Sequence, residues 1–236
     1  SVAFDDFFGF LTGWSIWIAE LISLPVFAIA FTKYLQYFIT LDFYQQVLVK
    51  GVFLFLLTYV NIRGVKAAGK VNDVLTIIKL VPLILLVIVG FWFFFHHPET
   101  PTSNYIPFAP LGFSSFGGAL VLIFWAYAGF EISTIPAEEI SKPEKTIPRA
   151  IVLSIIIVIV FYLTTNLVLF GVRNWNYLLN DAAPLASAGH EIFSSNALLA
   201  LVGGGIVGIG VLISVAGSNE SVMIGTSPLV YALAAD

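Results

Sequence analysis

Long uncharged apolar stretches constrain this chain more than any other feature. Residues 150–172 read AIVLSIIIVIVFYLTTNLVLFGV and contain no acidic or basic side chain. Of the 236 residues, 59% are hydrophobic and only 10% are charged, against about 25% charged in soluble proteins. A helix satisfies its own backbone hydrogen bonds in lipid, and about 20 apolar residues carry it across a bilayer. The sequence therefore predicts an all-α, polytopic membrane protein.

Apolar windows predict about six spans within a single transmembrane domain that covers residues 1–236. The approximate spans are 8–39, 45–62, 72–95, 116–138, 148–172 and 196–235. Proline at 25 and 82 falls inside the first and third spans, and Pro25 is expected to kink its helix. The chain does not begin with Met and lacks the basic start of a signal peptide. We therefore expect it to be an internal part of a longer protein.

Basic residues indicate the orientation of the spans. They gather in two loops that lie on the same side if the spans alternate: Arg63, Lys66 and Lys70, and then Lys142, Lys145 and Arg149. Cytoplasmic loops of membrane proteins carry an excess of Lys and Arg. These two loops are therefore predicted to be cytoplasmic.

Composition also excludes several classes of function. The chain has no cysteine, so it offers no thiolate chemistry and no cysteine-based metal site. No basic stripe favours nucleic acid. A membrane enzyme would need a nucleophile and base or a set of metal ligands, and His96, His97 and His190 all fall in predicted loops. We therefore expect no enzyme activity, cofactor, metal or nucleic-acid partner.

Four ionisable residues fall inside the apolar windows, namely Glu20, Lys79, Glu131 and Glu220. Placing such a side chain at the bilayer centre costs about 2.5 kcal/mol or more on insertion scales. They therefore normally face a bundle interior or a water-filled cavity, and each is a candidate functional residue.

Each of these charges also has a structural interpretation. Lys79 can extend its ammonium group to the membrane interface, or it can be a buried group that binds and releases a proton. Glu20 can form an ion pair with Lys79 or can contact substrate or take part in coupling. Glu220 can line a cavity or can mark water at a helix end.

The segment FWAYAGFE, residues 124–131, places Gly129 and Glu131 within the fourth span, and Pro136 follows. A hydrophobic segment interrupted by Gly and Pro is typical of a broken helix, whose freed backbone groups bind substrates or ions. The alternative is a simple glycine kink that lets two helices pack closely.

The longer segment FWAYAGFEISTIPAEEISKPEKTIPRAI, residues 124–151, resembles the sixth helix and following loop of the amino acid–polyamine–organocation transporter superfamily. Two other segments are similar to its fourth-to-fifth helix junction and the end of its eighth helix: NIRGVKAAGKVNDVLTIIKL (61–80) and SPLVYALAAD (227–236). The resemblance implies that the chain covers the third to eighth helices of a five-plus-five inverted repeat with a broken helix near Gly129. The first discontinuous helix of that fold would lie outside this chain.

The resemblance also implies a substrate-binding set. Trp125 matches an aromatic residue that covers the bound substrate. The carbonyls of Ala126, Tyr127 and Ala128 fall at the break beside Gly129, where the family holds the amino group of the substrate. Glu20 falls on the face of the third family helix that approaches the substrate pocket.

A second set is implied for ion or proton coupling. Lys79 resembles the fifth-helix lysine of proton-coupled members, whose ammonium stands in for the sodium ion of related transporters. Ser218, Asn219 and Ser221 fall on the eighth-helix face near that ion position. Glu131 and Glu220 complete the predicted coupling set.

Together these features predict secondary active transport of amino acids or related amines across the cell membrane, by proton-coupled symport. The expected partners are a small-molecule substrate, protons and the lipid bilayer. Two alternatives remain within this fold: an exchanger of substrate for product, and a non-transporting membrane module that lacks the first two helices. A channel has no filter or ring motif in its favour.

Overall fold

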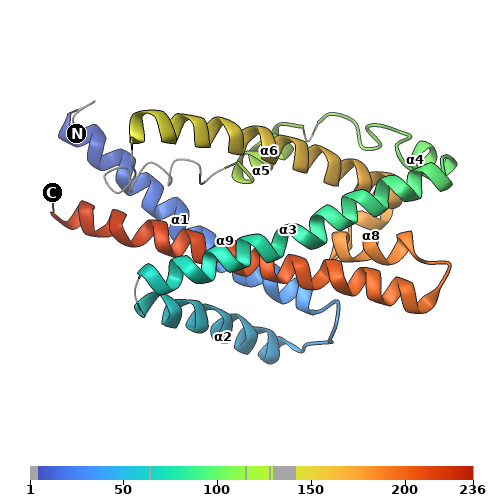
Figure 1. Cartoon of the computed structure of the whole chain (residues 1–236), viewed down its shortest axis with the longest axis horizontal. Helices are drawn as coiled ribbons and strands as arrows, with labels where there is room; N and C mark the ends of the chain where they lie inside the picture. Colours follow the sequence, from blue (N-terminus) through green and yellow to red (C-terminus); the bar gives the residue numbers. More distant parts are fainter. Residues whose placement is uncertain (1–4, 64, 115, 128, 130–141, 236) are drawn as a thin grey trace. The chain divides into compact units, whose positions relative to one another are not determined.

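The computed structural model describes residues 5–63, 65–114, 116–127, 129 and 142–235, and over these residues it contains helices and no strand. The helices are α1 (Asp6–Leu35), α2 (Phe43–Ile62), α3 (Val65–His96), α4 (Glu99–Asn104), α5 (Phe116–Trp125), α6 (Pro143–Val172), α7 (Trp175–Leu178), α8 (Pro184–Ile192) and α9 (Ala197–Ala235) (Figure 1). Helices α1, α2, α3, α6 and α9 are long and apolar enough to cross a membrane. The predicted all-α polytopic class is confirmed.

Side-chain caps set where several helices begin. Asp42 accepts a hydrogen bond from the Gln45 backbone at 2.9 Å, and the Gln45 side chain accepts one from the Asp42 backbone at 2.9 Å. This reciprocal capping box satisfies two backbone donors that the first turn of α2 leaves free. At the start of α9, Asn196 Oδ1 accepts from Leu198 and Leu199 at 3.0 and 3.2 Å. Local polar residues thus begin helices whose interiors are apolar.

The fourth predicted span is only partly helical in the described residues. Helix α5 ends at Trp125, and the next two residues close tight turns, Ala126 N to Ile123 O and Tyr127 N to Phe124 O, both at 3.0 Å. Gly129 has a φ of +105°, which side chains other than glycine disfavour strongly. The helix therefore ends before Gly129, where an interruption was predicted, and residues 130–138 of that span lie outside the described residues.

The chain divides into two compact units. The first unit comprises Ser1–Pro82 and Gly208–Asp236, and the second comprises Leu83–Val207. Helices α3 and α9 each contribute one part to each unit.

The core of the first unit lies between α1, α2 and the C-terminal part of α9. Ala28, Phe53 and Leu57 are buried there, and Ala216 and Met223 of α9 pack against them. The Phe31 ring stacks on Phe53, with 4.4 Å between ring centroids. Helix α2 thus packs against both α1 and this part of α9.

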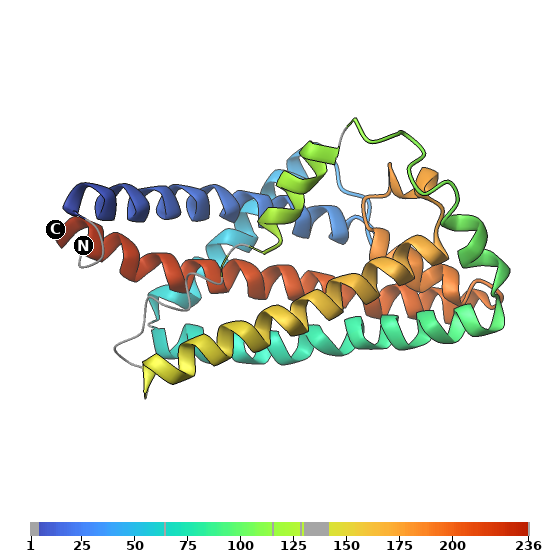
Figure 2. The same cartoon turned by 90° about the horizontal axis from the view of Figure 1, so that it is seen from above.

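The core of the second unit is wholly apolar among its described buried residues. It is formed by Leu86, Phe93, Val168, Val172, Ala188, Ile192 and Val207. In Figure 1 the C-terminal part of α3 and α6 approach each other toward the end that carries α4 and α8, and Figure 2 shows that the two helices cross at an angle. A Cβ atom on Gly90 would overlap Val168, and one on Gly203 would lie 2.7 Å from the Gly189 carbonyl. Small residues therefore let these helices approach closely, as is common in membranes.

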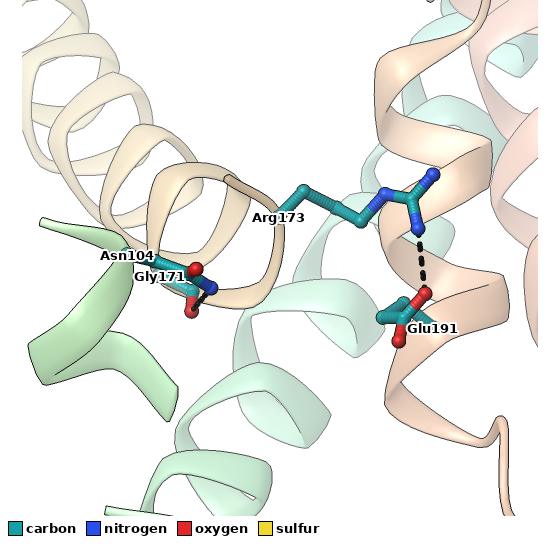
Figure 3. Close-up of polar contacts among 4 residues, drawn as sticks. All are labelled: Asn104, Gly171, Arg173 and Glu191. Atoms are coloured by element: carbon teal, nitrogen blue, oxygen red, sulfur yellow. Dashed lines mark hydrogen bonds and ion pairs between the residues drawn. The ribbon is translucent and has the colours of Figure 1, made fainter. Parts of the chain in front are cut away.

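In the second unit, two polar side chains at the end of α4 form hydrogen bonds with helix α6. Asn104 Nδ2 donates to the Gly171 carbonyl at 2.8 Å (Figure 3). Tyr105 donates its hydroxyl to the Leu167 carbonyl at 2.6 Å. Burial raises the pKa of the Tyr105 hydroxyl, which keeps it a donor. The bond from Asn104 satisfies one of the last four carbonyls of α6, which have no donor within the helix, and the bond from Tyr105 adds a second contact one turn earlier.

Candidate functional site

Helix α9 packs closely against α3 in the first unit. Ser221 donates its hydroxyl to Asn72 Oδ1 at 2.8 Å. One turn earlier, a Cβ atom on Gly217 would lie 3.1 Å from Leu75 Cβ, and two turns before that a Cβ atom on Gly210 would overlap the Pro82 ring. As the residue number falls along α9 it rises along α3, so the two segments run antiparallel.

This packing fixes the position of Lys79 along α9. Lys79 lies four residues after Leu75 and three before Pro82, so all three share the α3 face that meets α9. Lys79 is half-buried. On the facing side of α9, Ser214 lies between Gly210 and Gly217 at the same spacing, and the register places it level with Lys79.

Sequence reasoning missed Ser214. The resemblance grouped Ser218, Asn219 and Ser221 on one face of this helix, near the ion position of the family. Ser221 lies on the α3-facing side of α9, as its bond to Asn72 shows, and Ser218 is half-buried beside it. The available signal was the run of small residues at positions 210, 214, 217 and 221, which has the spacing of one helix face. The coupling roles given to these residues stay predictions.

A second face of α9 meets α1. Asn219 is fully buried, and its Nδ2 donates to the Leu24 carbonyl of α1 at 3.4 Å. Its Oδ1 has no hydrogen-bond partner among the described residues. Glu20 lies one turn before Leu24 and is also buried, with 7% of its surface exposed. The α1 side of the first unit therefore holds a carboxyl and an amide within the protein interior.

A third face of α9 meets α2, and Glu220 lies on it. Ala216, Glu220 and Met223 follow one another at helical spacing, and the two apolar members pack into the core with Phe53 and Leu57. Glu220 has no exposed surface, and neither of its carboxyl oxygens has a hydrogen-bond partner in the described part of the chain. This carboxyl is buried in an apolar surrounding rather than at a water-filled helix end.

The polar neighbour of Glu220 on α2 is Asn61. The Asn61 Nδ2 donates to the Leu57 carbonyl at 3.1 Å. The same nitrogen lies 3.7 Å from the Met223 sulfur. The amide thus lies beside the Glu220 carboxyl, but it makes no hydrogen bond of good geometry to either carboxyl oxygen.

The predicted substrate-binding carbonyls lie in the second unit, just after α5. The Ala126 carbonyl accepts a hydrogen bond from the Tyr162 hydroxyl of α6 at 3.0 Å. The rings of Tyr127 and Tyr162 meet edge to face, with centroids 5.5 Å apart. Sequence reasoning did not single out Tyr162, and no motif links it to a residue 36 positions earlier.

The other predicted residues of this set are placed only in part. Trp125, at the end of α5, is 47% exposed. Ala128 and Glu131 lie outside the described residues, so their predicted roles are untested. Among the residues that the structure places, no group of three or more His, Asp or Glu side chains could hold a metal ion.

Comparison of the sequence with known proteins assigns the chain to a family. The sequence profile of the family described as Amino acid permease matches residues 1–236. The D-serine/D-alanine/glycine transporter of Escherichia coli is 29% identical over 235 residues, which cover 96% of this chain and 48% of that protein.

Two further relatives match at similar levels. The aromatic amino acid transport protein AroP of Escherichia coli is 27% identical over 205 residues, covering 82% of this chain and 44% of the relative. The branched-chain amino acid permease BcaP of Lactococcus lactis is 28% identical over 221 residues, covering 82% and 46%. The chain thus spans about half the length of the curated relatives it matches.

These matches confirm the resemblance to amino acid–polyamine–organocation permeases, and with the five apolar helices they make the chain an integral membrane protein. Because the family profile runs over the whole of residues 1–236, this chain belongs to the amino acid permease family.

Proposed function

We propose that the protein to which this chain belongs is a secondary active transporter of amino acids or related amines, driven by proton symport. The named relatives act on aromatic amino acids, on D-serine, D-alanine and glycine, and on branched-chain amino acids. These substrates share an ammonium and a carboxylate and differ in side chain. We therefore expect the family to share the part of the site that binds the ammonium and carboxylate groups of the substrate.

The observation that supports the substrate site is the Ala126 carbonyl beside the end of α5. It accepts a side-chain hydroxyl rather than continuing the helix. A carbonyl oxygen has two lone pairs, so one remains for an N–H of a substrate ammonium after Tyr162 has taken the other. Trp125 precedes this carbonyl by one residue and would cover the bound substrate.

Coupling is assigned to Lys79, which lies half-buried on the face of α3 that meets α9. An ammonium in this position changes its interaction energy when the two helices move apart or when its proton leaves. Either change would link proton movement to the rocking of the helices. Snorkelling of Lys79 toward the interface is the structural alternative.

Uptake by the full-length protein in proteoliposomes tests this function. A panel of labelled amino acids and polyamines is offered with and without an inward proton gradient. Accumulation of an amino acid that requires the gradient supports symport. Uptake that ignores the gradient and requires substrate inside the vesicle would instead identify an exchanger, and no uptake of any member would reject transport of this class.

Lys79→Ala then tests the coupling residue against Lys33→Ala, an exposed lysine in the last turn of α1. Proton-dependent uptake should be lost in Lys79→Ala and kept in the control. Unchanged proton dependence in both variants would remove Lys79 from the mechanism.

A further inference from the structure

We propose that Glu220 is a proton-binding site in its own right, separate from Lys79. Its carboxyl holds a proton while α9 is packed against α2, and it loses that proton only when the two helices separate enough to admit water. Its part in transport rests on the proposed function, whereas its protonation in the packed state does not.

The first argument is the place of Glu220 in the core. It lies on the α9 face between Ala216 and Met223, which pack with buried Phe53 and Leu57 of α2. No part of its surface is exposed. An ionised carboxylate moved from water into such surroundings loses its hydration, and proteins normally avoid that cost by neutralising the group.

The second argument is the lack of donors. An ionised carboxylate is only an acceptor, and it is stable in a protein interior when N–H or O–H groups point at it. Neither oxygen of Glu220 has such a partner in the described chain. The one donor beside it, the Asn61 amide, donates to the Leu57 carbonyl and also contacts the Met223 sulfur, so the carboxyl does not have this donor to itself. A neutral carboxylic acid fits this site, and an anion does not.

The third argument is the placement of the other charged groups. From α1, the titratable residue on the α9 side is Glu20, which is itself acidic. From α2, Arg63 is exposed beyond the end of the helix and contacts Tyr59. From α3, Lys70 and Asp73 lie nearest to the level of Glu220, and both are exposed. Lys79 lies level with Ser214, six residues or about 9 Å along the axis from Glu220. Lys79 also meets a different face of α9, so it does not supply a counter-ion.

Glu220 therefore joins protonation to packing. A proton on its carboxyl favours the state in which α2 covers it, and loss of the proton favours a state in which water reaches it. This is the property that a coupling group requires, because its two protonation states prefer different helix arrangements.

Infrared spectroscopy of the purified full-length protein tests the protonation directly. The carbonyl-stretch band of neutral carboxylic acids should lose intensity in Glu220→Gln relative to the wild type at neutral pH. Glu191→Gln, which alters a partly exposed carboxylate that already has an arginine partner, should leave the band unchanged. Equal band intensity in the wild type and in Glu220→Gln overturns the proposal.

Transport measurements test the coupling. A gradient of one pH unit supports about tenfold accumulation per coupled proton. Glu220→Gln should lose that accumulation while it still exchanges labelled for unlabelled substrate across the membrane at the wild-type rate. Accumulation equal to the wild type overturns the coupling role, and so does loss of exchange at normal protein abundance, which would mean a structural or substrate-binding role.

The two experiments separate this inference from the proposed function. A Glu220-dependent infrared band in a protein that transports no amino acid or amine would sustain the proton site and reject the function. Wild-type transport with no such band would do the reverse.

Discussion

Glu191 and Glu220 are both glutamates, one in each unit of the chain, and their surroundings are opposite. Glu191 of α8 accepts from Arg173 at 2.6 Å, and 37% of its side chain is exposed (Figure 3). Glu220 of α9 is fully buried with no donor in the described chain. In the second unit Glu191 lies where an arginine partner and water reach it, and in the first unit Glu220 lies inside the core.

This difference shows that apolar packing explains the core of the second unit but not the whole core of the first. Apolar burial and close glycine contacts are sufficient to explain the packing around Val168. They do not explain Glu220, because a buried polar group without a partner costs about 1–3 kcal/mol. The first unit therefore carries a group that reduces its stability, as expected for the proton site proposed above.

The largest effect is expected from Gly90→Ala, which tests how tightly the apolar core of the second unit is packed. The new Cβ would lie 2.6 Å from Val168 Cγ2 and closer still to Cγ1, and Val168 is fully buried. Overpacking should lower the free energy of unfolding by about 1–3 kcal/mol, and adding Val168→Ala should restore part of it. Denaturant titration of the full-length protein in detergent measures both.

Gly51→Ala provides the matched control for this change. Gly51 also lies within a helix, α2, but its Cβ would meet nothing within 4 Å. Because alanine favours the helix over glycine by about 1 kcal/mol, this variant should be as stable as the wild type or more so. Equal stability of the two variants would contradict the tight packing at Gly90.

Glu220→Leu sharpens the comparison in the opposite direction. It replaces an unpartnered buried carboxyl with an apolar side chain of similar size, next to Phe53 and Met223. The free energy of unfolding should rise by about 1–3 kcal/mol, while proton-driven accumulation is lost. A decrease in stability would show that the carboxyl has a bonded partner in the full-length protein.

Some of these features could be predicted from the sequence, and others could not, for physical reasons. Apolar composition alone predicts the all-α class, since a bilayer leaves few alternatives. The end of α5 before Gly129 follows from local backbone preference. The face that Glu220 presents could not be predicted, because α9 is apolar on nearly every side and its neighbours are chosen by packing.

The same reason limited the prediction of the candidate site. Asn219 and Ser221 are two residues apart, and the sequence grouped them, yet one bonds to α1 and the other to α3. Tyr162 bonds to Ala126 across a long separation in sequence, with no local pattern to mark it. Contacts between helices depend on register and rotation, which a single sequence does not encode as a motif.

Two tyrosines of the second unit give a smaller and more selective test. Tyr162 and Tyr105 each donate a hydroxyl to a backbone carbonyl, of Ala126 and Leu167 respectively. Changing either to Phe should lower the free energy of unfolding by about 1 kcal/mol, the usual net worth of such a bond. Only Tyr162→Phe should also alter the KM for amino acid uptake, since only Ala126 belongs to the proposed substrate site. Equal KM values in both variants would remove Tyr162 from that site.

The smallest effect is expected from Glu191→Gln, which changes the more exposed of the two glutamates. The variant breaks the ion pair with Arg173, whose side chains are 37% and 26% exposed respectively. Such partly exposed pairs contribute about 0.2–1 kcal/mol, and salt weakens them further. The loss of stability should therefore shrink as the ionic strength of the denaturation buffer is raised. The change caused by Glu220→Gln should not respond to salt, because the group replaced there is neutral and inaccessible to ions. A salt-dependent stability change at Glu220 would mean that its carboxyl is charged, and the contrast between the two glutamates would then be one of partners rather than of protonation.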